Sequence, residues 1–152
     1  MDDIETATAI EAIAAVEAIK KVQGTYGRSV DIHDWDLLRT TVTDDFSVDT
    51  GAQGKGATDG LEAFIARVKT NPAITVHHAI LPEIDLTSPT TADGAWAAHL
   101  FAKLPDGTAI DSYGHYYNTY EKVGGAWKVK SLKLIWLHRE VRPGEPLAAT
   151  SA

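Results

Sequence analysis

A pair of adjacent glycines between two aromatic-rich segments is the feature that most constrains the fold. Gly124 and Gly125 separate residues 113–123 from residues 126–138, and both segments are rich in aromatic and β-branched side chains. Such segments favour β-strands. Only glycine adopts positive φ angles without steric cost, so two in succession favour the type I′-like turn of a β-hairpin. The sequence therefore predicts a long antiparallel hairpin over residues 113–138.

The second arm of this hairpin changes the face on which its apolar side chains lie. They occupy odd positions up to Val129 and even positions from Leu132 onward. Adjacent residues of a strand point to opposite faces, so the buried face changes parity only through an extra residue. We therefore expect a β-bulge near Lys130 and Ser131. A long strand that bends in this way suits a strongly curved sheet that closes over a pocket.

The N-terminal third of the chain has helical periodicity. Apolar residues recur every three positions from Thr8 to Gln23, which predicts a helix that Gly24 is expected to end. The same stripe, carried one turn further, places Tyr26 on the interior side. Asp34 is positioned to cap a short second helix that begins at Trp35.

The remaining pattern completes an α+β protein. Helices come first and long strands follow, which predicts helices packed on one face of a curved, mainly antiparallel sheet. A sheet bent over a helix layer leaves a concave mouth, a usual site for a small apolar ligand. The further elements that we expect are a strand over 46–50, a flexible loop over 51–60, a helix over about 59–69, and strands over 74–86 and 95–104.

A histidine interrupts an otherwise apolar face of the strand predicted over 74–86. The other even positions of this strand carry Ile, Val, Pro or Leu, and His78 is the exception. Because neighbouring residues of a strand point to opposite faces, His77 should face away from the interior. An imidazole titrates near neutral pH, which suits a general base or acid. We therefore take His78 as the candidate base, with a core histidine bonded to a backbone carbonyl as the alternative.

Composition excludes several classes of function. The 152 residues are about one domain's worth, which we place at residues 1–140 with a flexible tail at 141–152. The net charge of −7 argues against nucleic acid and anionic membrane surfaces as partners. The chain has no cysteine and its first residues are acidic, so we expect a cytoplasmic protein without a secretory signal or disulfides.

Motifs for metals, nucleotides and covalent catalysis are weak in this sequence. Six histidines are present, but no pair has the spacing of converging metal ligands. The glycine-rich loop over 51–60 lacks the Lys-Ser/Thr pair of a phosphate-binding loop. No serine nucleophile motif is found. We therefore expect neither a metal nor a cofactor.

Short motifs along the chain have an order and spacing that carry a family resemblance. They are Tyr26, Asp31, Asp34-Trp35, Thr75-Val76-His77-His78, Tyr113-Gly114-His115-Tyr116 and Gly125-Ala126-Trp127. Together, from about residue 7 to 138, they resemble the SnoaL-like branch of the nuclear transport factor 2-like superfamily. The resemblance implies a cone-shaped α+β barrel that forms a homodimer or a trimer. The family includes polyketide cyclases, scytalone dehydratase, bile acid dehydratases and ketosteroid isomerase relatives.

The resemblance also implies a set of site residues. Family dehydratases use a Tyr near the end of the first helix, an Asp five residues later and a His on the strand after the third helix. Tyr26, Asp31 and His78 match these positions. Asp31 would orient the imidazole and Tyr26 would hydrogen-bond a substrate carbonyl; a solvated carboxylate and a core tyrosine are the alternatives. Candidates for substrate contact, for which sheet packing is the alternative, are His115, Asn118, Tyr113 and Trp96.

Three functions remain open from the sequence. The first is a cofactor-independent lyase or isomerase with dehydratase-like acid–base chemistry. Its substrate would be a small, cyclic, largely apolar carbonyl compound such as a polyketide, a steroid or an aromatic metabolite. The second is a non-catalytic ligand-binding or assembly module, such as the small subunit of a ring-hydroxylating oxygenase. The third is an aldol-type polyketide cyclase. In each case we expect a homo-oligomer, because one helix layer cannot cover both faces of an apolar sheet.

Overall fold

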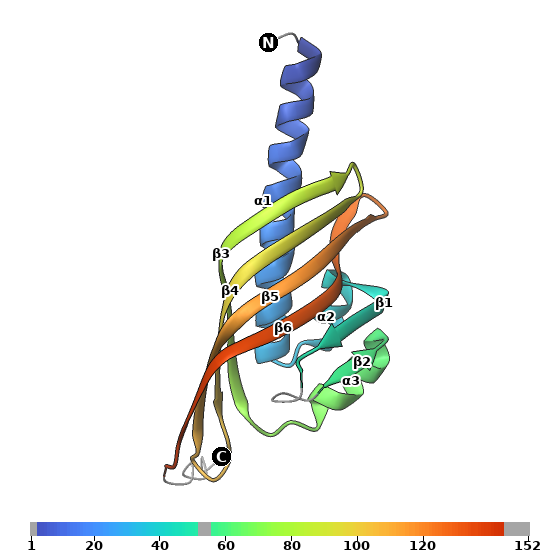
Figure 1. Ribbon diagram of the computed structural model, residues 1–152. Helices are drawn as coiled ribbons and strands as arrows, with labels where there is room; N and C mark the ends of the chain where they lie inside the picture. The colour runs from blue at the N-terminus through green and yellow to red at the C-terminus, as the bar shows by residue number, and fades with distance from the viewer. Residues whose placement is uncertain (1–2, 52–55, 145–152) are drawn as a thin grey trace.

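Helices pack on one face of a curved sheet, as the sequence predicts for an α+β protein (Figure 1). A computed structural model describes residues 3–51 and 56–144. The elements in chain order are α1 (Asp3–Asp31), α2 (Trp35–Thr41), β1 (Val42–Asp49), β2 (Ala57–Asp59), α3 (Leu61–Lys69), β3 (Ile74–Ser88), β4 (Thr91–Lys103), β5 (Ala109–Val123) and β6 (Ala126–Arg142).

The six strands form one mixed sheet in the order β2-β1-β6-β5-β4-β3. Only β1 and β6 run parallel, and the other neighbours are antiparallel. The long strands β3–β6 cross α1, while α2, α3, β1 and β2 lie together to one side (Figure 1). No helix in the described part of the chain is long and apolar enough to cross a membrane.

The predicted hairpin and its bulge are both present. Gly124 and Gly125 have φ angles of 59° and 83°, and they connect β5 to β6. In the pairing of these strands Thr119 faces Ser131 whereas Tyr120 faces Val129, so the residue between them on β6, Lys130, is extra. The bulge therefore lies where the parity change in the sequence predicts it.

A second bulge, which the sequence analysis did not anticipate, lies in β3. Ile80 pairs with Ala97 but Glu83 pairs with Ala95, so β3 has one extra residue between these pairs. Leu81 adopts a positive φ of 52° at this point. The strand lies at the edge of the sheet and carries Pro82, which is tolerated at edges and bulges.

The β3 bulge overturns the predicted orientation of the two adjacent histidines. Ala79 and Ile84 both pack against the core, so the inward positions are odd before the bulge and even after it. The sequence prediction takes one parity along the whole strand. The expectation that His78 faces the interior and His77 faces away is therefore wrong, because the apolar even positions before the bulge lie on the outer face of the sheet.

Helix α1 is longer than its periodicity predicts. It passes through Gly24 without ending and continues to Asp31. Tyr26 is only 5% exposed, which confirms that it faces the interior. The first turns of α1 extend beyond the sheet (Figure 1), so Ile10 and Ile13 remain exposed despite their place in the apolar stripe.

A reverse turn at the end of α1 fixes the position of Asp31. The backbone N–H of His33 donates to Val30 O at 3.2 Å, and that of Asp34 donates to Ser29 O at 2.9 Å. This pair of bonds is a Schellman motif, in which His33, with φ 58°, takes the left-handed position that glycine usually fills. The Asp34 side chain then caps α2, as predicted. Asp31 is thereby held as the last residue of α1.

A buried polar network ties α1 to the sheet. The Tyr120 hydroxyl donates to Gln23 Oε1 at 2.8 Å and accepts a hydrogen bond of 2.8 Å from the Trp96 indole. The Asn118 amide donates to the same Gln23 oxygen at 2.8 Å. All four side chains are buried. The network is a packing feature of the core.

Two predictions fall partly on residues 52–55 and 145–152, which lie outside the described residues. The loop predicted over 51–60 includes the short strand β2 at its end. The tail predicted from residue 141 begins within β6, which runs to Arg142. The remainder of both segments stays a prediction.

Candidate functional site

A cavity of about 380 Å³ opens between the helix layer and the inner face of the sheet. This volume is at the low end of the range of ~300–1,000 Å³ found for small-molecule sites. Apolar side chains form most of its wall: Val30, Val48, Phe64, Val68, Leu100, Leu104, Ile110, Leu132, Leu134 and Trp136. Polar side chains that line it include Tyr26, His77, Tyr116 and Arg67. The cavity therefore combines a mainly apolar wall with a set of polar groups, which also includes His33, Thr50, Asn71, Thr75, Ser112 and Arg139.

His77 and Asp31 form a hydrogen-bonded pair at the cavity wall. Nδ1 of His77 lies 2.5 Å from Oδ1 of Asp31. Oδ2 of Asp31 accepts a hydrogen bond of 2.9 Å from the backbone N–H of His77, and Oδ1 also accepts one of 2.9 Å from the Thr75 hydroxyl. Three donors from β3 thus hold one carboxylate at the end of α1.

The position of Asp31 is electrostatically unfavourable for the helix but favourable for the histidine. A carboxylate at a helix C-terminus faces the negative end of the helix dipole, at a cost of ~0.3–1 kcal/mol. Burial alone would raise the pKa of the Asp31 carboxyl, but the hydrogen bonds and electrostatic attraction of His77, with the bond from Thr75, outweigh it and lower that pKa. Asp31 therefore stays ionised and oriented toward His77.

The pair leaves one nitrogen of His77 available for chemistry. With Nδ1–H donating to the ionised Asp31, Nε2 carries the lone pair of the neutral imidazole. Nε2 has no hydrogen-bond partner among the residues that the structure describes. The helix can approach the histidine closely because Gly27 lies against it, where a Cβ would be 3.5 Å from Cβ of His77.

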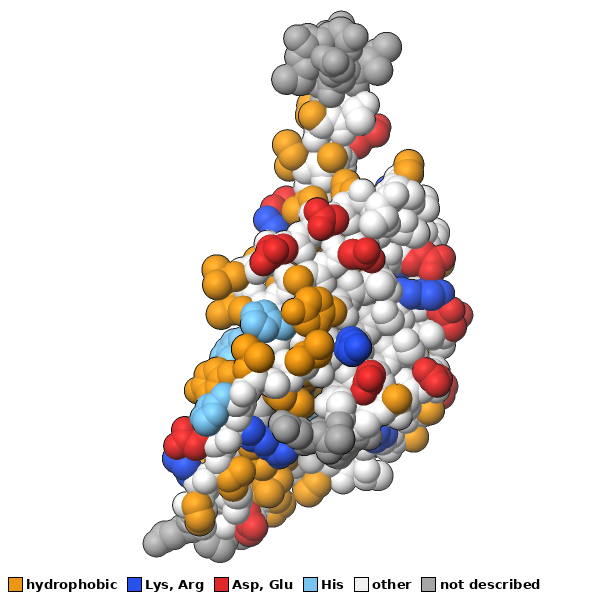
Figure 2. All heavy atoms as spheres, in the orientation of Figure 1, with side chains coloured by type: hydrophobic (Ala, Val, Ile, Leu, Met, Phe, Trp, Pro, Cys, Tyr) orange, Lys and Arg blue, Asp and Glu red, His pale blue; other side chains and the backbone are white. Residues whose placement is uncertain are grey.

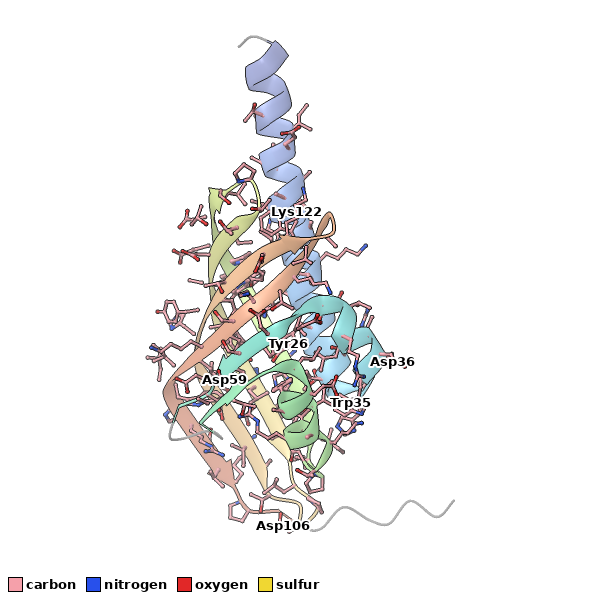
Figure 3. All side chains as sticks on the ribbon, turned by 90° about the vertical axis from the view of Figure 1, so that its right-hand side faces the viewer. Tyr26, Trp35, Asp36, Asp59, Asp106 and Lys122 are labelled. Atoms are coloured by element: carbon pink, nitrogen blue, oxygen red, sulfur yellow. The ribbon has the colours of Figure 1, made fainter. Side chains whose placement is uncertain are left out.

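Two tyrosines present their hydroxyl groups beside the pair. Tyr26 and Tyr116 line the cavity, and each is at most 5% exposed. Neither hydroxyl has a hydrogen-bond partner in the described part of the chain. Burial raises the pKa of Tyr26 and of Tyr116 above the ordinary value, so both remain neutral donors. Tyr26 lies in the middle of the molecule (Figure 3), with its ring centroid 5.9 Å from that of Phe46 on β1 and 6.4 Å from that of Phe64 on α3.

Comparison with known proteins identifies the family. The model of the SnoaL-like domain family matches residues 11–133, most of the chain. The protein belongs to the SnoaL-like family. This confirms the predicted resemblance, and the solved relatives of this SnoaL-like domain confirm the nuclear transport factor 2-like fold.

Three solved structures illustrate the likeness. A hexachlorocyclohexane dehydrochlorinase superposes with a TM-score of 0.81 at 19% identity, over 95% of this chain and 99% of that one. A provisionally assigned scytalone dehydratase from Novosphingobium aromaticivorans gives 0.75 at 22% identity, over 94% and 99%. A Δ5-3-ketosteroid isomerase from Mycobacterium sp. gives 0.63 at 18% identity, over 82% and 98%. At these identities the likeness shows the fold alone.

The structure brings together only part of the site predicted for this SnoaL-like domain. Tyr26 lines the cavity, and Asp31 lies behind it, hydrogen-bonded to His77. His78 instead lies on the outer face, where its Nδ1 is 3.3 Å from Nδ1 of His99. The four substrate-contact candidates are absent from the described residues that line the cavity: Tyr113 and His115 lie on the outer face of β5, and Asn118 and Trp96 belong to the buried network.

Sequence reasoning missed most of the residues that line the cavity, and three of them matter for its chemistry: His77, Tyr116 and Arg67. His77 was assigned to the wrong face, although the proline five residues later signals the bulge that reverses the face. Tyr116 follows from the hairpin alternation once the inner face of β5 is known. Arg67 on α3 gives no local signal, because basic residues near helix C-termini are common.

Within residues 3–51 and 56–144, no three His, Cys, Asp or Glu side chains gather as metal ligands would. Among the described residues, the groups at the cavity that can move a proton or bind a charge are His77 paired with Asp31, the imidazole of His33, the phenols of Tyr26 and Tyr116, and the guanidinium groups of Arg67 and Arg139.

Proposed function

We propose that this SnoaL-like domain is a cofactor-independent lyase or isomerase that moves a proton on a small, cyclic, largely apolar carbonyl compound. One observation carries the proposal: Nε2 of His77 and the hydroxyls of Tyr26 and Tyr116 are unpartnered within the described residues around one apolar cavity. Three polar groups that the described residues leave unpaired at the wall of one mainly apolar cavity point to a ligand that completes their hydrogen bonds.

In the proposed reaction His77 is the general base. Its Nε2 takes a proton from the carbon next to the substrate carbonyl, and the imidazole becomes an imidazolium. Asp31 stabilises that positive charge through Nδ1–H. As the C–H bond breaks, its electron pair moves onto the carbonyl oxygen, where Tyr26 and Tyr116 donate hydrogen bonds to the developing enolate.

Two outcomes follow from the enolate. If the β-carbon carries a hydroxyl, the enolate electrons form a C=C bond, the C–O bond breaks, and hydroxide takes the proton from His77 to leave as water. If it carries no leaving group, the imidazolium returns the proton to another carbon, which shifts a double bond. The dehydratase, dehydrochlorinase and isomerase names of the solved relatives support this class of reaction.

The open cavity favours catalysis over the assembly-module alternative, which needs no polar groups there. The aldol-type cyclase uses the same base and enolate and differs only in the substrate. A direct test incubates the protein with cyclic β-hydroxy ketones and β,γ-unsaturated ketones and follows the absorbance of the conjugated product. We expect turnover that falls about 10²–10⁴-fold in His77→Gln. Turnover that this substitution leaves unchanged would contradict the proposal.

We further propose that the protein forms a homo-oligomer through the outer face of the sheet. Figure 2 shows hydrophobic and histidine side chains gathered over the long strands. Ile80, Tyr117, Ile135 and Leu137 are each at least 44% exposed there. An exposed sheet face with many apolar side chains is typical of a protein–protein interface, and a second copy offers the matching surface.

A further inference from the structure

The cavity carries a cation that has no counter-ion in the described part of the chain. Arg67 on α3 lines the cavity, and among the described residues it forms no ion pair with a carboxylate. None of the described lining residues is Asp or Glu. Arg139 also lines the cavity, but of the described lining residues only Arg67 is unpaired in this way. The protein as a whole has a net charge of −7, so a cavity lined by two guanidinium groups and no acid differs from the average character of the molecule.

The hydrogen bonds of Arg67 hold the guanidinium but do not satisfy it. Nη1 donates to Oγ1 of Thr58 at 2.6 Å and to the carbonyl of Gly56 at 3.4 Å. Nε is buried without any partner within the described residues. A guanidinium has five N–H donors in a planar fork, and the usual acceptor for that fork is a carboxylate or phosphate that binds in a bidentate manner. The bonds of Nη1 thus hold the guanidinium in place, while Nε remains without an acceptor in the described part of the chain.

Arg67 lies on the same wall as the proposed proton-transfer groups. Its Cζ is 5.4 Å from the centre of the Phe64 ring. That ring stacks on Tyr26 with a centroid separation of 6.4 Å. Arginine keeps its proton under all ordinary conditions, so this wall holds a permanent positive charge next to the hydroxyl that would bind the substrate carbonyl.

We propose that Arg67 binds a carboxylate of the substrate, so that the preferred substrates are cyclic carbonyl acids rather than neutral ketones. The carboxylate pairs with Arg67 while the reacting carbonyl lies at Tyr26 and Tyr116. This rests on the proposed function in taking the cavity as the substrate site. A purely structural role, tying α3 to β2 through Thr58, uses Nη1 alone and leaves the buried Nε unexplained.

The test compares acids with neutral partners of the same shape. A panel of cyclic and bicyclic keto acids and their primary amides is screened for the rise in Tm, at constant ionic strength and at pH 7. The best pair is then measured by isothermal titration calorimetry. We expect the acid to bind at least about tenfold more tightly than its amide, as one charge-assisted bidentate pair allows. Equal binding of acid and amide across the panel, or no binding by any acid, overturns the proposal.

Substitutions test whether Arg67 is the residue that makes the acid bind more tightly than its amide. Arg67→Met keeps the stem and removes the charge, and should abolish the preference for the acid while leaving amide binding within about twofold. Arg67→Lys keeps the positive charge but loses the planar pair of N–H donors, so it should retain part of the preference for the acid. Arg28→Met, on the exposed side of α1, is the matched control and should retain the full preference. A preference that survives in Arg67→Met overturns the assignment, as does its loss in Arg28→Met.

Binding and turnover, measured side by side in the same variants, separate this inference from the proposed function. His77→Gln removes the proposed base but leaves Arg67 in place, so it should still bind the acid more tightly than the amide. If His77→Gln keeps full turnover while the acid preference depends on Arg67, the proposed base is wrong and the carboxylate site stands. If turnover depends on His77 but acid and amide bind equally, His77 stands as the base and the carboxylate site at Arg67 is wrong.

Discussion

Asp31 at the end of α1 and His77 on β3 are joined by two hydrogen bonds, although the two residues are 46 positions apart in the sequence. One carboxylate oxygen is 2.5 Å from Nδ1 of the ring, and the other accepts the backbone N–H of the same residue at 2.9 Å. The carboxylate therefore fixes both the ring orientation and the position of β3 against the end of α1. The pair is at once a structural link and the proposed catalytic base with its orienting acid.

Asp31→Asn should destabilise the protein in a pH-dependent way. The folded pKa of Asp31 is held below its ordinary value, so its stabilising contribution is present above about pH 4 and is lost as the pH falls through the lower folded value. We expect a loss of about 1–3 kcal/mol in the free energy of unfolding at pH 7, and a smaller loss at pH 3. Urea denaturation at both pH values measures it.

The control for this prediction is Asp36→Asn, whose side chain is fully exposed on α2 (Figure 3). It should change the free energy of unfolding by less than about 0.5 kcal/mol at either pH. An Asp31→Asn deficit that is the same at pH 3 and pH 7 would show that the ionised carboxylate is not what stabilises the link.

The three buried tyrosines should respond differently to loss of their hydroxyls. Tyr26→Phe and Tyr116→Phe remove groups without partners in the described residues, so each should leave the free energy of unfolding within about 0.5 kcal/mol of wild type. Tyr120→Phe breaks the bonds to Gln23 and Trp96 and should cost about 1–3 kcal/mol. Denaturation of the three variants side by side checks this. A cost at Tyr26 as large as at Tyr120 would mean that its hydroxyl is already satisfied by the protein.

Local chemistry made part of this architecture predictable. Two glycines with positive φ defined the hairpin, a parity change in β6 located the bulge at Lys130, and Asp34 marked the start of α2. Each of these features depends on the residue itself or on its immediate neighbours. The family resemblance then supplied the arrangement of helices over the sheet.

What could not be predicted depends on tertiary packing. Helix α1 continues through Gly24 because contacts with the sheet outweigh the weak helix propensity of one glycine. The apolar even positions at the start of β3 face outward, since a sheet with two apolar faces gives no local sign of which one the helices cover. The bulge at Leu81 makes the odd positions before it the inward-facing ones. His77, and not His78, therefore faces the cavity.

Gly24 should be replaceable with a gain in stability. It lies in the interior of α1, and a Cβ there would meet nothing within 4 Å. Gly24→Ala removes backbone freedom from the unfolded chain, so the free energy of unfolding should rise by about 0.5–1 kcal/mol. Thermal and urea denaturation measure the change. A loss of stability would indicate that α1 bends or ends at this position.

Gly94 should behave in the opposite way. A Cβ at this position would lie 2.9 Å from Cε2 of Tyr120 and 3.2 Å from Nε1 of Trp96, both in the buried network. Gly94→Ala should therefore cost about 1–3 kcal/mol through overpacking. The same denaturation experiments, run beside Gly24→Ala, test it. Wild-type stability in Gly94→Ala would mean that the Tyr120 ring shifts freely.

The outer face of the sheet should determine the oligomeric state. Light scattering should give a mass above that of one chain for wild type, and a double substitution Ile80→Glu with Ile135→Glu should shift it toward the monomer. Burying a carboxylate in an apolar interface is strongly unfavourable. Ile10→Glu, at an isoleucine on α1 that is more exposed than either Ile80 or Ile135, is the control and should leave the assembly intact. A monomeric wild-type protein would refute the proposed interface.

The most direct test of the central claim is the exchange of substrate α-protons for deuterium, followed by NMR in D₂O with the cyclic carbonyl compound that the protein turns over fastest. Two adjacent histidines provide a matched pair of variants. If His77 is the base, His77→Gln should slow exchange by about 10²–10⁴-fold while His78→Gln stays within about twofold of wild type. Undiminished exchange in His77→Gln, or an equal loss in both variants, would contradict the account.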